Sequence, residues 1–586
     1  GTIQGAGLRG VFTGEVPDAN VLHAARLALN MQLDSLADLG IAVGPATVSN
    51  RPVELKFDLT HSNNNQRPLA IKGEMKADTW SAEVRAEMEG LRATSAYQLQ
   101  MTTVLDPPQK IVTPFSRGLP VTVPLTARLE LRGQLEHSDG GIGRLDLKAE
   151  GVELTLQGNL LSLGKKDRSV DLMLKADSLR RLGPLLSSSF PTTAPVRMTG
   201  RFKKVGQGIA IAPFRLDVGG SDFYGAIRYH PREDERQVAK VAGHLMSNRF
   251  DRKDFKGPDA PGNALQERPR FFSGEPFLLN WISSHDIDID YRAAKVIFNT
   301  HRLDDLQAQV IVEDGILAVD NAHAGMYSGT LQLNLALDGN QRPYKVRYGY
   351  HLRGMEIERW PTERTDTGRL TGNVDIELQI VGSGDSVREV VADANGHALI
   401  IIHNAKIPHK TRKWLQTSIL MAILKTIIPF SEDPAAFNVE CGLVGFRIND
   451  GVAVSDHTAV LQAKEMAVLA SGGINLETEE IEFSIRTKVR QGLGISPESL
   501  SGFGPGHVLS PQYVLGGTLS EPLLVRPDRV LKTGVTLGAA WLTGGVTVLV
   551  QGLFDRWTSQ DVCGKAATRF GKSIQSKKSV TPESTD

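Results

Sequence analysis

The stretch VDIELQI, residues 374–380, alternates apolar and polar side chains without a break. A period of two places Val374, Ile376, Leu378 and Ile380 on one face of an extended strand and their polar neighbours on the other. The polar neighbours include two carboxylates that need water or polar partners, so only one face can be buried. The pattern therefore predicts a one-sided β-strand.

The same alternation recurs along the chain, and turn residues such as Asp450-Gly451 punctuate it at short intervals. Short turns of this kind are typical of antiparallel hairpins, whereas parallel strands would need a helix after each strand, and few helical patterns occur. We expect a mainly β fold, an elongated, curled antiparallel sheet that forms a repeating β-groove, with a few short helices near the C-terminus. The other alternating sets are Val121, Val123, Leu125, Ala127, Leu129 and Leu131; Val170, Leu172, Leu174 and Ala176; and Leu331, Leu333, Leu335 and Leu337.

A loose internal repeat supports this interpretation. Copies begin at Gly208, Gly315 and Gly451, each with a glycine, an alternating strand, a short turn and a second strand. Their uneven spacing favours stacked hairpins over propeller blades of equal size. Residues 20–39, where helical and strand periods compete, are expected to form a helix or an irregular segment.

A chain of 586 residues is too long for one compact core. We expect a series of segments instead, the first of them a fragment of a longer chain. The expected segments are an N-terminal β-groove segment (1–135), two β-repeat segments (136–280 and 281–410), a C-terminal region (411–531) with a helix at 411–428, an apolar helical element (532–570) and a disordered tail (571–586).

The charge balance disfavours nucleic acid as a partner, and the polar motifs of the chain do not indicate a catalytic site. Lys and Arg together number 66, as do Asp and Glu, so no net field attracts nucleic acid. The run Ser284-His285-Asp286 places triad residue types side by side, but neighbours on an extended strand point to opposite faces. Paired carboxylates such as Glu479-Glu480 are expected to be solvated at a turn. We predict no enzyme activity, no catalytic residue, no metal site and no cofactor.

Cys441 and Cys563 are the two cysteines of the chain. A disulfide between them would need an oxidising compartment and would tie the C-terminal tail to a strand. Two buried free thiols in a reducing cell are the alternative.

Two segments break the strand pattern. Residues 411–428 predict a helix, with Arg412, Lys413 and Trp414 at its start, which suits a lipid headgroup interface or a plug at the end of the groove. Residues 533–554, which include Trp541, lack charge but contain five glycines, so we expect an element that skims a membrane or caps the groove.

Two stretches, GRLTGNVDIELQI (368–380) and GSGDSVREVVADANGHALIIIHNAKI (382–407), resemble the opening of the C-terminal region of the AsmA family. The later strand FRINDGVAVSD (446–456) and both cysteines fit the same region, and VRMTGRFKK (196–204) is similar to earlier repeats of the family. The resemblance implies a periplasmic protein of a Gram-negative cell. It also implies an inner-membrane anchor upstream of Gly1 and a part in outer-membrane lipid homeostasis.

A one-sided apolar face must be covered, and a sheet curled into a gutter would cover it while leaving room for hydrocarbon. Such a gutter could hold aliphatic chains. The family resemblance implies that these belong to phospholipids of the inner and outer membranes, with possible envelope protein partners. Ordinary β-sandwiches are the structural alternative, and a scaffold or assembly factor that binds outer-membrane proteins through sheet edges is the functional one. The residues expected to contact acyl chains are Leu331, Leu333, Leu335, Leu337, Val374, Ile376, Leu378 and Ile380.

Overall fold

The structure is a computed structural model. It describes residues 1–578 except 6–7, 16–25, 35–51, 62–68, 79, 90–93, 107–108, 114–115, 122–123, 135–140, 161–168, 187–192, 232–237, 256–269, 278, 280–281, 299–300, 361–369, 409–435, 464–465, 490–512 and 526–561. The chain divides into two compact units, unit 1 (Gly1–Asn263) and unit 2 (Ala264–Asp586).

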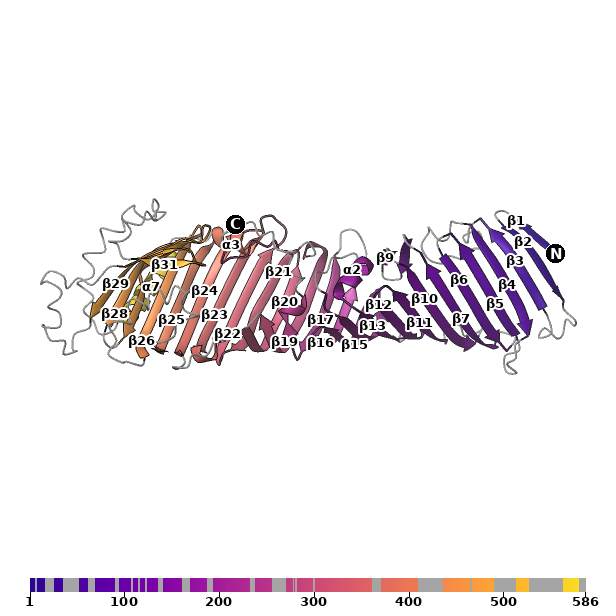
Figure 1. Cartoon of the computed structure of the whole chain (residues 1–586), viewed down its shortest axis with the longest axis horizontal. Helices are drawn as coiled ribbons and strands as arrows, with labels where there is room; N and C mark the ends of the chain where they lie inside the picture. The colour runs from indigo at the N-terminus through magenta and orange to yellow at the C-terminus, as the bar shows by residue number, and fades with distance from the viewer. Residues whose placement is uncertain are drawn as a thin grey trace. The chain divides into compact units, whose positions relative to one another are not determined.

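Unit 1 is an antiparallel sheet in which strands adjacent in the sequence are neighbours in space (Figure 1). Strands β8 (Gln109–Thr113) and β9 (Ser116–Val121) form a separate hairpin, so β7 pairs with β10. The other strands are β1 (Thr2–Gly5), β2 (Leu8–Glu15), β3 (Arg26–Leu33), β4 (Val53–His61), β5 (Leu69–Ala77), β6 (Trp80–Met88), β7 (Ala96–Leu105), β10 (Leu125–Gln134), β11 (Ile142–Ala149), β12 (Val152–Gly158), β13 (Ser169–Ala176), β14 (Val196–Val205), β15 (Gly208–Val218), β16 (Ser221–His230), β17 (Ala239–Ser247) and β18 (Phe250–Asp251).

Unit 2 repeats this arrangement, because consecutive strands from β19 to β31 pair antiparallel. Its strands are β19 (His285–Phe298), β20 (His301–Glu313), β21 (Ile316–Met326), β22 (Gly329–Asp338), β23 (Lys345–Glu356), β24 (Thr371–Ser383), β25 (Asn395–Pro408), β26 (Ala436–Asn449), β27 (Val452–Ala463), β28 (Met466–Asn475), β29 (Ile481–Val489), β30 (Tyr513–Gly517) and β31 (Pro522–Val525).

The three sequence repeats are hairpins with a common irregularity. They correspond to β15–β16, β21–β22 and β27–β28, and each has a register shift within its first strand. Such bulges bend a strand and increase its twist, which favours a curled sheet. Asp314-Gly315 and Asp450-Gly451 precede the second and third copies with positive φ at both residues, as two-residue hairpin turns require.

The described helices are few and short. They are α2 (Leu179–Leu186), α3 (Val387–Ala392) and α7 (Val562–Lys578), with 3₁₀ turns η5 (Arg252–Phe255), η6 (Ile282–Ser284) and η7 (Ile357–Arg359). The predicted fold class, a curled antiparallel sheet with few helices, is confirmed.

Two local predictions are wrong. Within 20–39, residues 26–33 form strand β3. Their alternation of apolar and polar side chains packs well between neighbouring strands, and this packing outweighs their helical propensity. The predicted disordered tail begins too early, since α7 continues to Lys578. The predicted helix at 411–428 and the apolar segment 533–554 lie outside the described residues.

Candidate functional site: an apolar trough

The inner face of the unit 2 sheet carries continuous rows of apolar side chains that cross neighbouring strands. Leu333 of β22 lies opposite Tyr350 of β23, which lies opposite Leu378 of β24, which lies opposite Ala398 of β25. Antiparallel pairing brings side chains of one face directly beside each other, so a period of two along each strand becomes an unbroken row across the sheet. We call the partly exposed part of this face the open floor; it consists of Val319, Leu333, Leu335, Tyr348, Tyr350, Ile376, Leu378, Ile380, Ala398, Ile400 and Ile402.

Two separate buried clusters border the open floor. One lies at one set of strand ends and contains Ile282, Val312, Leu337, Tyr344, Val346 and Val390. The other lies at the opposite strand ends and contains Met326, Leu331, Leu352, Met355 and Val374. This face of the sheet is therefore a trough, with side chains that are buried at both rims and partly exposed on the floor between them. All described strands of unit 2 belong to one sheet, so a sandwich of two separate sheets is not observed in that part of the chain.

The eight predicted groove residues all lie on this inner face but in two settings. Leu331, Leu337 and Val374 are buried in the rim clusters. Leu333, Leu335, Ile376, Leu378 and Ile380 belong to the open floor, where a ligand could reach them. Their contact with acyl chains stays a prediction.

Strand β23 supplies floor residues that the sequence reasoning missed, Tyr348 and Tyr350. Burial raises the pKa of Tyr348 to about 12, and the neighbouring Tyr350 phenol adds to the rise. Burial also raises the pKa of Tyr350, whose hydroxyl donates to Sδ of Met326 at 3.8 Å. Phenols with raised pKa values indicate an apolar environment. The alternation Val346, Tyr348, Tyr350, Leu352 was the signal that could have identified them.

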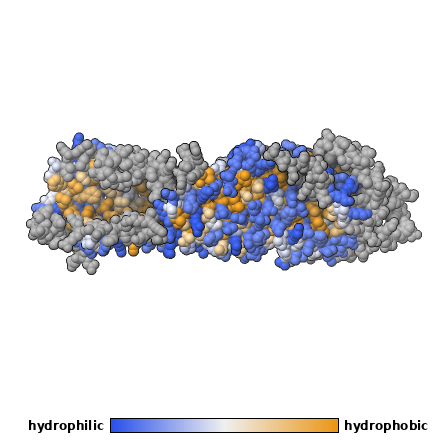
Figure 2. Space-filling view, turned by 180° about the vertical axis from the view of Figure 1, so that it is seen from behind, coloured by the Kyte–Doolittle hydropathy of each residue, from blue (hydrophilic) through white to orange (hydrophobic). Residues whose placement is uncertain are grey.

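Unit 1 has an apolar face of the same kind. Leu147, Leu154, Leu174, Met198 and Leu216 form one row across β11–β15, and all of them are partly exposed. Helix α2 covers one edge of this face, where Leu182 packs in a cluster with Val152, Ala176, Val196 and Val218. Figure 2 shows apolar residues gathered in a hollow over the strands near the N-terminus.

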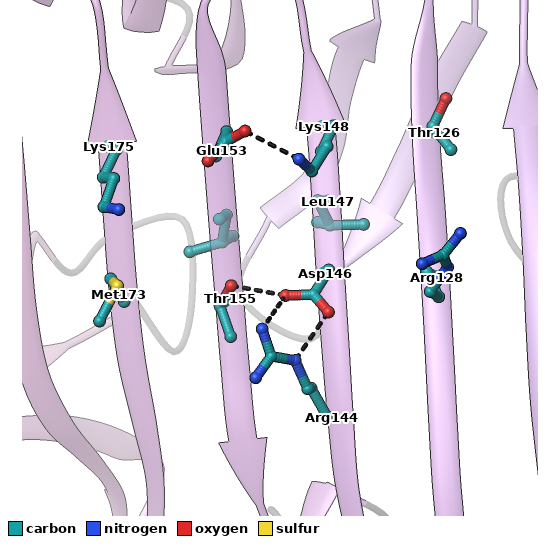
Figure 3. A pocket seen from close by; sticks show the side chains of 11 residues that line it. Thr126, Arg128, Arg144, Asp146, Leu147, Lys148, Glu153, Thr155, Met173 and Lys175 are labelled. Carbon is teal, nitrogen blue, oxygen red and sulfur yellow. Dashed lines mark hydrogen bonds and ion pairs between the residues drawn. The ribbon is translucent and has the colours of Figure 1, made fainter.

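The outer face of unit 1 is polar and internally paired. Over β10–β13 it forms a shallow hollow (Figure 3), where Arg144 donates to both carboxylate oxygens of Asp146 at 2.8 and 3.0 Å. Thr155 Oγ1 donates to the same carboxylate at 2.6 Å, and Lys148 Nζ lies 2.9 Å from Glu153 Oε1. The Arg144 hydrogen bond lowers the pKa of Asp146, although burial opposes it. These pairs suit a face exposed to water.

Cys441 and Cys563 form a disulfide with a Cα–Cα distance of 6.5 Å, as the sequence predicted. The bond joins β26 to α7, which packs with Val562 and Ala566 against Leu443 and Val460 on the outer face of the sheet. Gln462 Oε1 also accepts a hydrogen bond from the Val562 amide at 3.0 Å. The C-terminal helix is thus fixed to the side of the sheet opposite the trough.

The expectation of a solvated Glu479 is wrong. Its carboxylate is 1% exposed and accepts hydrogen bonds from the backbone amides of Phe271 and Phe272 at 2.8 and 2.9 Å. A charge is stable in such a place because two donors replace its water. The partners are about 200 residues away in the sequence, so no local signal indicates them.

The predicted membrane-proximal residues Arg412, Lys413, Trp414 and Trp541 lie outside the described residues. Among the helices that the structure describes, none has the length and apolar character to cross a membrane. Within the described ranges, no group of three or more His, Cys, Asp or Glu side chains is arranged to hold a metal ion.

Fold and site together define an open-sheet β protein with an apolar trough. Residues 252–445 match the model of the AsmA family, which confirms the predicted resemblance over this part of the chain. The AsmA family protein YhjG of Escherichia coli (strain K12) is 22% identical over 449 residues, which cover 68% of this chain. The chain spans 62% of the length of that relative.

Proposed function

We propose that the apolar troughs bind the acyl chains of phospholipids, and that the protein supports the passage of lipid between the inner and outer membranes and outer-membrane homeostasis. The periplasm, with an anchor upstream of this chain, is the proposed location. The proposal includes no chemical step, and the absence of enzyme activity stays a prediction.

One observation carries the proposal: the open floor is uncharged and partly exposed. Leu, Ile, Val, Ala and Tyr side chains supply it, while charged side chains such as Asp375 and Glu377 alternate to the outer face. Burying apolar surface stabilises a complex by about 25 cal/mol per Å², so an uncovered aliphatic floor favours a hydrocarbon ligand. A charged ligand would find few partners for its charge there.

The comparisons support the cellular setting. AsmA family membership is generally linked to envelope biogenesis. The disulfide fits an oxidising compartment such as the periplasm.

The test is a charged substitution in the open floor. Leu333→Glu places a carboxylate where an acyl chain would lie, and we expect labelling by a phosphatidylcholine with a diazirine in one acyl chain to fall by about tenfold or more. Gln332→Glu is the matched control, because Gln332 is exposed on the outer face of the same strand.

Equal labelling of the wild type and Leu333→Glu would contradict the lipid proposal. If the variant nevertheless kept its contacts with outer-membrane proteins, the scaffold function through sheet edges would become the better account.

A further inference from the structure

The inner face of unit 2 changes character between β25 and β27. In β21–β25 two rim clusters flank a partly exposed floor. In β26–β30 a single cluster extends from one set of strand ends, at Ile448 and Ala453, to the other, at Val439 and Ala463. It continues onto the end of β25 at Ala405 and Ile407, and the floor residues Leu378, Ile380 and Ile402 pack against its edge. The trough is therefore open over the first group of strands and filled over the second.

Burial of individual side chains follows the same boundary. Ala398 and Ile400 of β25 are partly exposed. Beyond β26 the inner-face residues are buried: Ala453, Ala459, Leu461, Val468, Ala470, Ile474, Ile481, Phe483, Ile485 and Leu515. Apolar side chains packed this closely leave no room for a hydrocarbon chain without displacement of protein atoms.

Two aromatic rings bridge the sheet at this boundary. Phe446 of β26 and Phe483 of β29 are separated by β27 and β28, so a flat sheet would hold them roughly 14 Å apart. Their ring centroids are instead 6.0 Å apart in an edge-to-face contact with an interplanar angle of 88°. The sheet therefore curls tightly enough for inner-face side chains of distant strands to touch across the trough.

The two rings have different exposures. Phe483 is 6% exposed and lies within the filled region. Phe446 is partly exposed and continues the floor row of Leu378 and Ala398. Phe446 is thus the last aromatic residue of the open floor row, and Phe483 packs against it from the filled region.

We propose that Phe446 and Phe483 form the end wall of the unit 2 trough, so that an acyl chain occupies β21–β25 and stops at β26. This inference rests on the proposed function, because it defines the extent of the same site. It excludes an entry or exit for lipid through the β27–β30 end of unit 2. Lipid that occupies the open floor must enter and leave it elsewhere.

Photolabelling of the whole protein with the same diazirine lipid, followed by residue-level mass spectrometry, tests the wall. In the wild type we expect adducts on the floor residues of β22–β25 and about tenfold fewer on the inner face of β27–β29, a ratio that two excluded methylene groups would produce. In Phe446→Ala/Phe483→Ala, adducts should extend to Ala459 and Ala470. Phe570→Ala is the matched control: Phe570 of α7 packs on the outer face of the same strands, against Gly445, and its loss should leave the boundary unchanged.

A second variant keeps the inference falsifiable if the double alanine variant does not fold. Ala398→Phe adds a ring one strand before the wall, and we expect labelling of Ile400 to fall while labelling of Leu333 persists. Equal wild-type labelling of Ala470 and Ile400, or an unmoved boundary in Ala398→Phe, would overturn the wall but leave the lipid function intact. No adduct anywhere on the inner face would overturn both.

Discussion

At the scale of single residues, Glu479 is the one charged side chain that is buried among the described residues of unit 2. Its buried carboxylate receives the amides of Phe271 and Phe272, and Arg270 Nη1 donates to the nearby Glu477 carbonyl at 3.0 Å. On the other side, the Arg388 guanidinium donates to the Phe272 carbonyl. The segment 270–272 is thus held to the β28–β29 turn by the Glu479 carboxylate and by the Arg270 guanidinium.

Replacing this carboxylate should destabilise unit 2. Glu479→Ala leaves two donors without an acceptor, and we expect a loss of roughly 2–5 kcal/mol in the free energy of unfolding. Faster hydrogen exchange at the Phe271 and Phe272 amides is the measurement. Glu480→Ala is the control, because Glu480 is exposed and its loss should change stability little. Unchanged exchange in Glu479→Ala would show that other contacts hold the segment.

The sequence predicted the faces of individual side chains but not their burial. Period-two alternation correctly placed Leu333 and Ile376 on one face, because the side-chain period of a strand is fixed by its geometry. The distinction between buried Leu337 and partly exposed Leu335 depends on curl and on segments far away in the sequence. No single strand contains that information.

At the scale of elements, the sequence predicted the hairpin turns and the internal repeats. Asp450-Gly451 forms the predicted hairpin turn. The sequence did not predict the bulges, because no distinctive pattern surrounds Asn321 and His457, the bulge residues with positive φ. The docking of α7 was foreseeable only through Cys563, since its packing partners Leu443 and Val460 are more than 100 residues earlier.

The disulfide should contribute measurably to this docking. In Cys441→Ser/Cys563→Ser, we expect α7 to detach more easily and the apparent stability to fall by about 2–4 kcal/mol, because the link closes a long loop. Hydrogen exchange along 562–578 is the measurement. Lys572→Ser, an exposed change on the same helix, is the control. Identical protection of α7 in oxidised and Cys-free protein would contradict this expectation.

At the scale of the whole molecule, each unit is a series of strands that contact mainly their neighbours in the sequence. Chains of this kind resemble repeat proteins, whose stability is approximately a sum of local and nearest-neighbour terms. The length and the alternation predicted a long antiparallel sheet but left the β-sandwich as an alternative. The resemblance to the AsmA family and the shortage of helical patterns favoured the open sheet. The division at residue 263 was not predicted, because alternation continues on both sides of it.

Destabilisation should therefore stay local within a unit. Val170 is 1% exposed in β13, and Val170→Asp buries a charge without a partner. We expect faster hydrogen exchange in β12–β14 and unchanged exchange in β3–β5 of the same unit. Asp171→Asn, on the outer face of β13, is the control. Uniform loss of protection across unit 1 would instead show a single cooperative structure.

The covalent link between Cys441 and Cys563 also has a mechanical consequence. Under tension applied at the chain ends, a sheet of sequential hairpins would peel strand by strand. At Cys441 the load would pass directly through the sulfur atoms and bypass 122 positions of the chain, about 400 Å of extended polypeptide. The strands between the two cysteines, which include those of Phe446 and Phe483, would carry no load while the other strands unfold. They would become loaded only after a reductant had broken the disulfide.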